Sequence, residues 1–265
     1  MRQIELRQLI EAEVRRITAH PDGGTSYREP LVGFSGIDDA AFAELCRSVP
    51  GHLTPERLLP GARGLVSYFL PFAENVVLAN ARSARVAREW ATAYVETNRL
   101  LASIGERLIA TLAGHGVRAV AEAPTHAFDK QRLTAKWSHK SIACMTGLGS
   151  FGLNSLVITD AGCAGRFGSL VLDIDPGILA PPPRTRCLYF HDGSCGLCVM
   201  RCPVSALSRD TSFDRQACYR RLKETGARFT DLPHTNVCGK CSVGLPCSLR
   251  DPVQGLNPGL AHTGR

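Results

Sequence analysis

The stretch "CGLCVMRCP", Cys195–Pro203, sets the architecture expected for the C-terminal part of this chain. Its spacing, C-x2-C-x3-C-P, matches the last three positions of C-x2-C-x2-C-x3-C-P, the run of cysteines that binds [4Fe–4S] clusters in bacterial proteins. The first position of that run falls on Asp192. The stretch therefore indicates an iron–sulfur site in which one ligand is missing from its usual place.

The other cysteines are concentrated around this stretch. The chain has 265 residues and 11 cysteines, of which Cys46, Cys144 and Cys163 precede residue 187. The other eight lie within 187–247, and eight is the number of thiolates that two [4Fe–4S] clusters require. In a chain expected to stay in the cytoplasm, such a concentration favours metal or redox chemistry over a disulfide framework.

The spacing of these eight cysteines predicts how they divide. In two-cluster proteins the last cysteine of each run binds the other cluster. We therefore expect Cys195 and Cys198 to share the first cluster with Cys247. The remaining cysteine of the run joins three later ones on the second cluster: Cys202, Cys218, Cys238 and Cys241.

The first cluster still needs a fourth ligand. Cys187 is the cysteine that remains within 187–247, and we favour it. Asp192 is the alternative, although a carboxylate oxygen is a harder ligand than a cluster iron prefers.

Structural zinc sites are the competing interpretation of two C-x2-C pairs. Four cysteines satisfy one zinc ion and eight satisfy two, so the number of cysteines does not decide. The C-x3-C-P ending favours iron–sulfur clusters, because a zinc site has no use for this proline-terminated position. A zinc-stabilised binding module with a basic surface is the weakest alternative.

Composition narrows the class of protein. Hydrophobic residues make up 44% and charged residues 21%, which predicts a packed globular core. The apolar run "GLVSYFLPF" at 64–72 is too short to cross a membrane. The N-terminus mixes acids with bases and has no signal-peptide core, so we expect a cytoplasmic protein without a membrane partner. The formal net charge of +7 permits an acidic partner, nucleic acid included.

Periodicity and turn residues predict the order of the elements. The proline-rich "PGILAPPPRTR" at 176–186 marks the expected boundary between an α/β body (1–180), a cysteine-rich module (181–250) and a tail (251–265). Apolar spacing predicts helices over 4–17, about 84–113 and 130–147, strands over 64–72 and 117–124, and two strands paired with each other at 155–160 and 168–175.

Four segments carry a family resemblance. They are "PERLLPGARGLVSYFLPF" (55–72), "AEAP" (121–124), "GLGSFGLNSLVIT" (147–159) and the cysteine module at 187–247. With them the sequence resembles the epoxyqueuosine reductase family, cobalamin-dependent iron–sulfur enzymes of tRNA modification related to reductive dehalogenases. The resemblance implies an α+β fold, with a flavin-reductase/nitroreductase-like α/β body that binds cobalamin and a C-terminal ferredoxin-like module with two [4Fe–4S] clusters.

The sequence departs from the family pattern in several places. Asp192 replaces a cluster cysteine, as noted above. Ala121 stands where the family has its proton-donating acid, and Glu122 lies one step along. The segment "THAFDKQRLTA" at 125–135 is extra. The chain also ends soon after the cysteine module, without an extension that could help to grip tRNA. These departures make the cofactors better supported than the substrate.

Polar residues before and within the glycine segment are the candidates for the site. Five of them precede this segment and could face a cofactor or substrate: His126, Asp129, Lys130, His139 and Lys140. The alternative for each is a solvated side chain on the protein surface. Tyr94 is expected to be a core residue and Arg166 an exposed one in a turn. The candidate catalytic residues are Glu122, next to the family's acid position, and Asp129 and His139, which precede the glycine segment. The candidate cofactor contacts are Lys140, Gly147, Leu148, Gly149, Gly152 and Asn154.

Two functions remain open at this point. The first is a reductase in which two clusters reduce bound cobalamin, served by a reduced ferredoxin or flavodoxin-type electron donor and acting on a small-molecule or tRNA-borne substrate. The second is an electron-transfer protein or corrinoid-reducing activator that serves a partner and has no substrate of its own.

Overall fold

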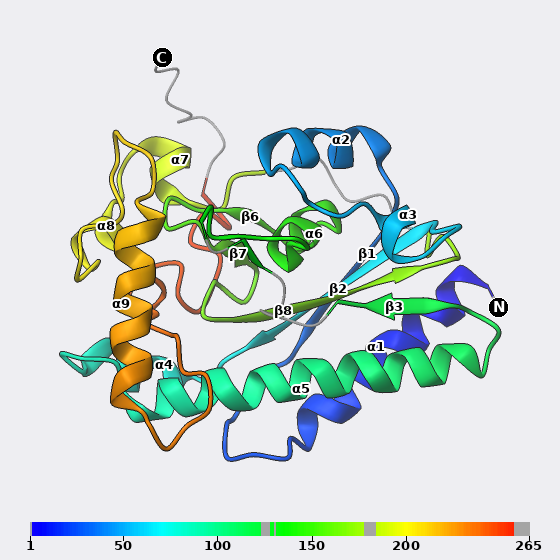
Figure 1. Cartoon of the computed structure of the whole chain (residues 1–265), viewed down its shortest axis with the longest axis horizontal. Helices are drawn as coiled ribbons and strands as arrows, with labels where there is room; N and C mark the ends of the chain where they lie inside the picture. Colours follow the sequence, from blue (N-terminus) through cyan, green and yellow to red (C-terminus); the bar gives the residue numbers. More distant parts are fainter. Residues whose placement is uncertain (1, 123–127, 130, 178–183, 257–265) are drawn as a thin grey trace.

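The fold is a mixed α+β structure built on a small antiparallel sheet (Figure 1). The structure is a computed structural model, and it describes residues 2–122, 128–129, 131–177 and 184–256. No helix among these residues combines the length and the apolar character needed to span a bilayer.

The central sheet has four strands in the order β1-β2-β8-β3, with every neighbouring pair antiparallel. These strands are β1 (Leu31–Gly36), β2 (Gly64–Pro71), β8 (Gly165–Leu172) and β3 (Ala119–Ala121). All residues of β2 are buried, because β2 has a strand on each side and helices over both faces. Burial on both faces explains why "GLVSYFLP" is continuously apolar instead of alternating, and the strand predicted at 64–72 is confirmed.

One face of the sheet packs on α1 (Gln3–Ala19) and α5 (Arg88–Ala113), which lie side by side along the bottom of Figure 1. Leu6 and Ile10 of α1 and Ile104 and Leu108 of α5 share one core with Tyr68 of β2. The helix predicted over 4–17 is confirmed. The helix predicted over about 84–113 begins at Arg88, after a separate α4 (Glu74–Arg82).

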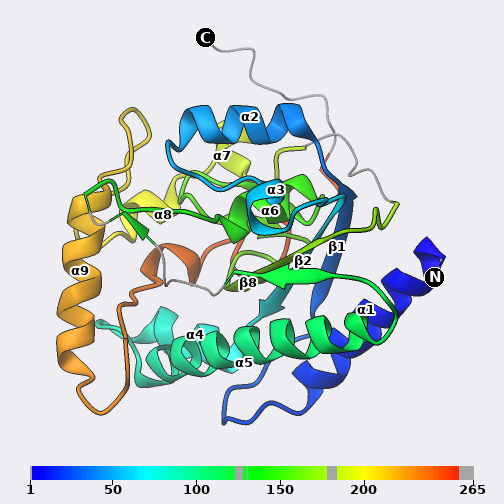
Figure 2. The ribbon, with the colours of Figure 1, turned by 45° about the vertical axis from the view of Figure 1, so that its right-hand side comes forward.

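The opposite face packs on α2 (Asp39–Ser48), α3 (Pro55–Leu58) and α6 (His139–Met145), which lie above the sheet in Figure 2. Phe42, Trp137 and Ile142 form the core here with Leu65 of β2. The indole Nε1 of Trp137 donates a hydrogen bond to the Ser169 Oγ at 3.0 Å. The sheet is therefore covered by helices on both faces, and the buried Ser169 hydroxyl places a polar group among the apolar side chains.

Two expected elements are wrong. The first half of the helix predicted over 130–147 does not form, because β4 (Phe128–Asp129) and β5 (Thr134–Ala135) pair there instead. The helix begins at His139, where the Ser138 side chain caps it by accepting a hydrogen bond from Ser141 N. The two strands predicted at 155–160 and 168–175 do not pair with each other. β7 (Val157–Thr159) pairs with β6 (Gly149–Phe151), and β8 pairs with β2 and β3.

The cysteine-rich segment beyond residue 184 is mostly loops with short helices. They are α7 (Leu188–Asp192), α8 (Leu197–Met200), α9 (Arg215–Arg228) and the 3-10 turn η1 (Lys240–Ser242). This segment packs on α4 and the start of α5, where Trp90 meets Phe229, Val237 and Val243. The boundary predicted near residue 180 stays a prediction, and 178–183 lie outside the described residues.

A buried ion network joins the two ends of the cysteine-rich segment. Asp251 is fully enclosed, and its carboxylate lies 3.2 Å from Arg186 Nη1 and 2.7 Å from Arg184 Nη2. Asp160, in the turn after β7, pairs with both arginines. The segment that begins at Arg184 and the segment that ends at Asp251 are thus held against the body by the same charges.

We expect Asp251→Ala to lower the free energy of unfolding by about 2 kcal/mol, because the buried Arg186 guanidinium loses its enclosed partner and keeps only the more exposed Asp160. Urea unfolding under anaerobic conditions measures this loss. The matched control is Asp231→Ala, which breaks an exposed pair with Arg88 and costs much less. Equal effects of the two substitutions would contradict the role given to the buried network.

Candidate functional site

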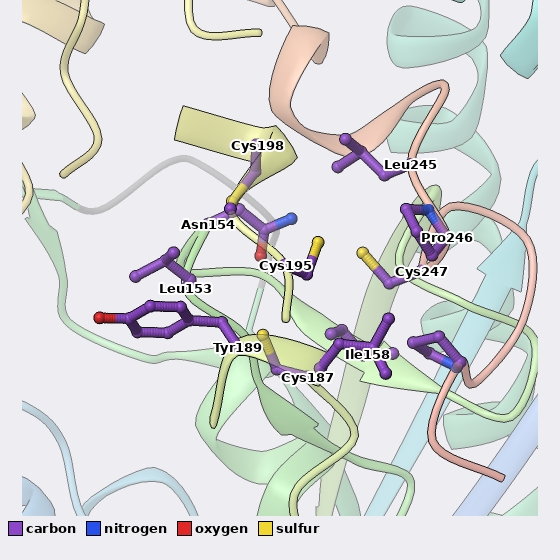
Figure 3. A pocket seen from close by; sticks show the side chains of 13 residues that line it. Leu153, Asn154, Ile158, Cys187, Tyr189, Cys195, Cys198, Leu245, Pro246 and Cys247 are labelled. Carbon is purple, nitrogen blue, oxygen red and sulfur yellow. The ribbon is translucent and has the colours of Figure 1, made fainter. Parts of the chain in front are cut away.

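Four cysteines surround one pocket. The residues that line it are Cys187, Cys195, Cys198 and Cys247. Cys187 directly precedes α7, Cys195 lies two residues before α8, and Cys198 lies within α8. Figure 3 shows their side chains around a common space, with Leu153, Ile158 and Leu245 among the apolar residues that enclose it. We call these four the first cysteine group. They are the set that the spacing predicts for the first cluster.

A second set of four lies beside the first. The pKa of Cys218 is raised to about 11, mainly by burial and then by the neighbouring thiols Cys238 and Cys202. Burial likewise raises the pKa of Cys241 to about 12, with contributions from the other three and from Cys198 of the first group. These contributions agree with the set of four that the spacing predicts, and Cys202 and Cys241 pack against the cluster of Cys198, Leu207 and Leu245. We call them the second cysteine group: Cys202, Cys218, Cys238 and Cys241.

The thiols of the first group also act on one another. Burial raises the pKa of Cys198 to about 11, and Cys247, Cys187 and Cys195 add to the shift. Crowded buried thiols resist ionisation in the absence of a cation, so binding of a metal must release their protons. Among the described residues, no group of three or more His, Cys, Asp or Glu side chains is arranged to hold a single metal ion.

Cys187, and not Asp192, is the residue that lines the pocket. Asp192 ends α7, and its Oδ1 accepts a hydrogen bond from Ser194 N at 2.9 Å. The placement supports Cys187 as the fourth ligand of the first cluster, which itself stays a prediction.

Residues of α4 and α5, and Ser83 just after α4, contact the loop that carries Cys238 and Cys241 of the second group. Lys240, between Cys238 and Cys241, is buried, and its Nζ donates to the carbonyl oxygens of Asn80 and Ser83, each at 2.6 Å. Asn80 Nδ2 donates to the Cys238 carbonyl at 3.0 Å. Gly239 has φ +71, and a Cβ there would lie 2.4 Å from the Trp90 indole. Only glycine fits at position 239, both for its backbone conformation and for this close approach.

Asn154 lies between the two groups. Its Nδ2 donates to the Cys241 carbonyl at 2.8 Å, and its side chain lines the pocket of the first group. Asn154 was expected to contact a corrin amide. That contact stays a prediction, and the structure places its amide on the cysteine segment.

The glycine segment packs on its own chain. A Cβ at Gly149 would lie 2.3 Å from the Ile158 carbonyl oxygen, and one at Gly152 would lie 2.9 Å from the Ile158 side chain. Gly147 follows α6 with φ +76, and Leu148 is buried against Ala143 and Phe69. The glycines are thus required by the β6–β7 hairpin, whatever else they contact. Their predicted role in cofactor binding stays a prediction.

A buried polar region lies at the open edge of β8. β3 pairs only with Leu170–Leu172, so Gly165–Ser169 have no strand partner on that side among the described residues. Arg166 was expected in an exposed turn, but its guanidinium stacks 4.4 Å from the Tyr94 ring, and burial lowers its pKa. Two polar atoms in this region, His139 Nε2 and Arg166 Nε, are buried and have no hydrogen-bond partner among the described residues, and the same holds for Asn98 Oδ1, one helical turn after Tyr94 on α5.

His139 and Lys140 start α6 beside this region. His139 Nδ1 shares a hydrogen bond with the Ser169 Oγ at 2.8 Å. Burial, helped by Arg166, lowers its pKa to about 4, so the ring is neutral at physiological pH. Lys140 Nζ donates to the Ser155 carbonyl at 2.8 Å, and burial followed by the Arg215 charge lowers its pKa.

The other two predicted catalytic residues lie apart from these contacts. Glu122 is half-buried just after β3. Asp129 is exposed, and its Oδ1 accepts hydrogen bonds from Gln131 N and Arg132 N, which lower its pKa. Such a carboxylate is a turn-stabilising group and a poor proton donor at neutral pH. The catalytic assignments stay predictions, and His126 and Lys130 lie outside the described residues.

Sequence reasoning missed Cys163. This buried thiol lies in the turn before β8, and its Sγ is 4.0 Å from the Sγ of Cys247 in the first group. No local pattern marks it, because Cys163 and Cys247 are far apart in the sequence and only the fold brings them together.

The fold is shared with reductases of known structure. An epoxyqueuosine reductase from Bacillus subtilis, solved with its catalytic loop swung out of the active site, matches with a TM-score of 0.54 and 18% identity over 97% of this chain and 71% of its own. An epoxyqueuosine reductase with an epoxyqueuosine-modified tRNA stem loop matches with a TM-score of 0.55 and 18% identity, over 98% and 67%.

A reductive dehalogenase has the same fold within a longer chain. The catabolic enzyme NpRdhA, in complex with 3-bromo-4-hydroxybenzoic acid, matches with a TM-score of 0.56 and 14% identity over 96% of this chain and 38% of its own. No family model and no curated protein matches the sequence. The structures confirm the resemblance drawn from the sequence motifs, and at these identities they establish the fold.

Replacing Cys187 tests the first cysteine group. We expect Cys187→Ala to reduce the iron content below the about eight atoms per chain that two [4Fe–4S] clusters need, because the first cluster loses a ligand. Anaerobic iron analysis and a visible spectrum measure this. Cys46→Ala, which removes a half-buried thiol of α2, should keep all the iron. Unchanged iron in Cys187→Ala would point to Asp192 or an external ligand.

The buried His139 predicts a pH effect. The unfolded chain binds a proton near pH 6.5, whereas the folded state does so only near pH 4. Stability is therefore fully present above pH 6.5 and falls as the pH drops through this window, by up to about 3 kcal/mol. His139→Asn should remove this part of the pH dependence, measured as the difference in unfolding free energy between pH 7 and pH 4. His115→Asn, at an exposed position, should retain it.

Proposed function

We propose that this protein is an iron–sulfur oxidoreductase of the epoxyqueuosine reductase type. In this proposal the first and second cysteine groups hold one [4Fe–4S] cluster each, and a cobalamin binds in the buried polar region at the open edge of β8. The body then corresponds to a flavin-reductase/nitroreductase-like domain and the cysteine segment to a ferredoxin-like module.

The observation that carries the proposal is the division of eight thiols into two neighbouring sets of four. The spacing of the sequence predicts these sets from the cross-over rule of two-cluster proteins. Support comes from the one pocket that the first four thiols line and from the electrostatic effects that the second four exert on one another. A cluster accepts ligands that are spread around four irons, whereas one zinc ion needs them within a single tetrahedron. Clusters of this kind supply one-electron transfer at low potential.

The polar region beside β8 contains buried polar groups that a ligand with amide substituents would satisfy. Asn98 Oδ1 can accept a hydrogen bond and Arg166 Nε can donate one, and neither has a partner among the described residues. A corrin ring carries amide groups around its edge that match both. Cobalamin, when bound, supplies a metal centre that accepts single electrons and reduces an organic substrate.

The residues of this chain have definable tasks around such a ligand. The neutral His139 is held by Ser169 and leaves Nε2 free to accept or donate. The buried cation Lys140 lies near the Cys241 thiol of the second group, and the buried cation Arg166 lies beside Tyr94. The charge of Lys140 offsets the negative charge that a thiolate-ligated cluster brings into the interior.

A tRNA-borne substrate is one of two substrate classes that the proposal admits, with a small molecule as the other. One structural neighbour is an epoxyqueuosine reductase with a modified tRNA stem loop. The surface of α9, which carries Cys218, exposes the basic side chains of Arg215, Arg220, Lys223 and Arg228. Such a surface suits phosphate groups, and it also suits an acidic electron donor of the ferredoxin or flavodoxin type.

Anaerobic purification with metal analysis, followed by titration with cobalamin, tests the proposal. We expect about eight iron atoms per chain and a change in the cobalamin spectrum at stoichiometric binding. The variant Arg166→Gln should weaken cobalamin binding and leave the iron content unchanged, because Arg166 touches no cysteine ligand in the described structure.

Two other outcomes of this experiment would contradict the proposed function. Iron without cobalamin binding would favour an electron-transfer protein or corrinoid-reducing activator that serves a partner. Zinc in place of iron would refute both functions.

A further inference from the structure

Cys163 lies against a predicted cluster ligand without belonging to either cysteine group. Its Sγ is 4.0 Å from the Cys247 Sγ, and the residue is 3% exposed. Backbone hydrogen bonds hold the two residues opposite each other, from Cys163 N to the Cys247 carbonyl at 2.9 Å and from Ala164 N to the Ser248 carbonyl at 3.0 Å. The contact is therefore built into the fold and does not depend on a mobile side chain.

The turn that carries Cys163 is shaped for this approach. Gly162 has φ +81, and a Cβ there would lie 2.5 Å from the Ser248 carbonyl oxygen. On its other side, Asn154 Nδ2 lies 3.9 Å from the Cys163 Sγ while it donates to the Cys241 carbonyl. Asn154 and Cys163 thus form a polar connection from the second cysteine group to the first.

The single S–H hydrogen of Cys163 has two acceptors within reach. One is the Ser242 carbonyl oxygen at 3.9 Å, and the other is the Cys247 sulfur at 4.0 Å. A thiolate bound to a cluster carries negative charge, and hydrogen bonds to charged acceptors are stronger than those to neutral ones. With a cluster in place, the Cys247 sulfur is the better acceptor of the buried Cys163 S–H.

We propose that Cys163 is a positioning residue that donates a hydrogen bond to the Cys247 sulfur and so raises the reduction potential of the first cluster. This inference rests on the proposed function, because it assumes a cluster on Cys247. Hydrogen bonds to ligand sulfurs stabilise the more negative, reduced form of a cluster. Cys163 therefore makes the first cluster easier to reduce than the same cluster without this donor.

The test compares Cys163→Ala and Cys163→Ser with the wild-type chain in anaerobic redox titrations followed by electron paramagnetic resonance. We expect Cys163→Ala to keep about eight iron atoms and to shift the first cluster to a more negative potential. Cys163→Ser retains a donor and should shift it less. The second cluster serves as an internal reference, and Cys46→Ala as the control for loss of a thiol elsewhere.

A second readout does not depend on a change in potential. The reduced first cluster should couple to one exchangeable proton that disappears in D2O, and this coupling should be absent in Cys163→Ala. The signal of the first cluster is identified as the one that Cys187→Ala alters. If Cys163→Ala is unstable, Cys163→Ser carries the test: its hydroxyl proton should give a coupling of different size from that of the wild-type thiol, whereas an unchanged set of exchangeable couplings overturns the inference.

The remaining outcomes overturn the inference in distinguishable ways. Full iron content with an unchanged potential and no coupled proton refutes the hydrogen bond and leaves the proposed function standing. Loss of iron in both Cys163 variants, with Cys187→Ala retaining it, makes Cys163 a ligand and not a donor. A wild-type chain that binds no iron refutes the proposed function, and the inference with it.

Discussion

The return of segment 238–251 to the body is the constraint on which the site depends. This segment supplies Cys238 and Cys241 to the second group and Cys247 to the first, so neither group is complete until it docks. Two buried charges hold it in place: Lys240, bonded to the carbonyls of Asn80 and Ser83, and Asp251, paired with Arg186. Charges of this kind are tolerated inside a protein only when they are matched, which makes the docked position specific.

The cysteine segment and the body consequently form one unit around the thiols. The corner between α4 and α5 contributes Asn80 and Trp90 to the second group, and the β6–β7 region contributes Asn154 between the groups. Three glycines, at 149, 162 and 239, allow these approaches because a Cβ would collide with backbone or indole atoms. The body therefore shapes the surroundings of the predicted clusters as well as the region beside β8.

Charge links the thiols to the region beside β8. Burial and mutual repulsion raise the pKa values of Cys198, Cys218 and Cys241, so the iron-free thiols stay protonated at neutral pH. Burial also lowers the pKa values of Lys140 and Arg166, which reflects the cost of enclosing cations. A negative cluster on the second group would relieve the cost at Lys140 together with that of the thiols, and such mutual relief is a physical reason for the two features to occur in one fold.

Local spacing was sufficient for part of this description. The sequence by itself determined the buried strand at 64–72 and the helices α1 and α5, because each depends on periodicity, and motif spacing supplied the prediction of two sets of four cysteines. Only the tertiary structure decided the strand partners of β7 and β8, the hairpin in place of the first half of helix 130–147, the burial of Arg166 and the position of Cys163 beside Cys247. Those features arise from contacts between segments that are distant in the chain, and short apolar runs or isolated residues carry no information about which distant segment they will meet.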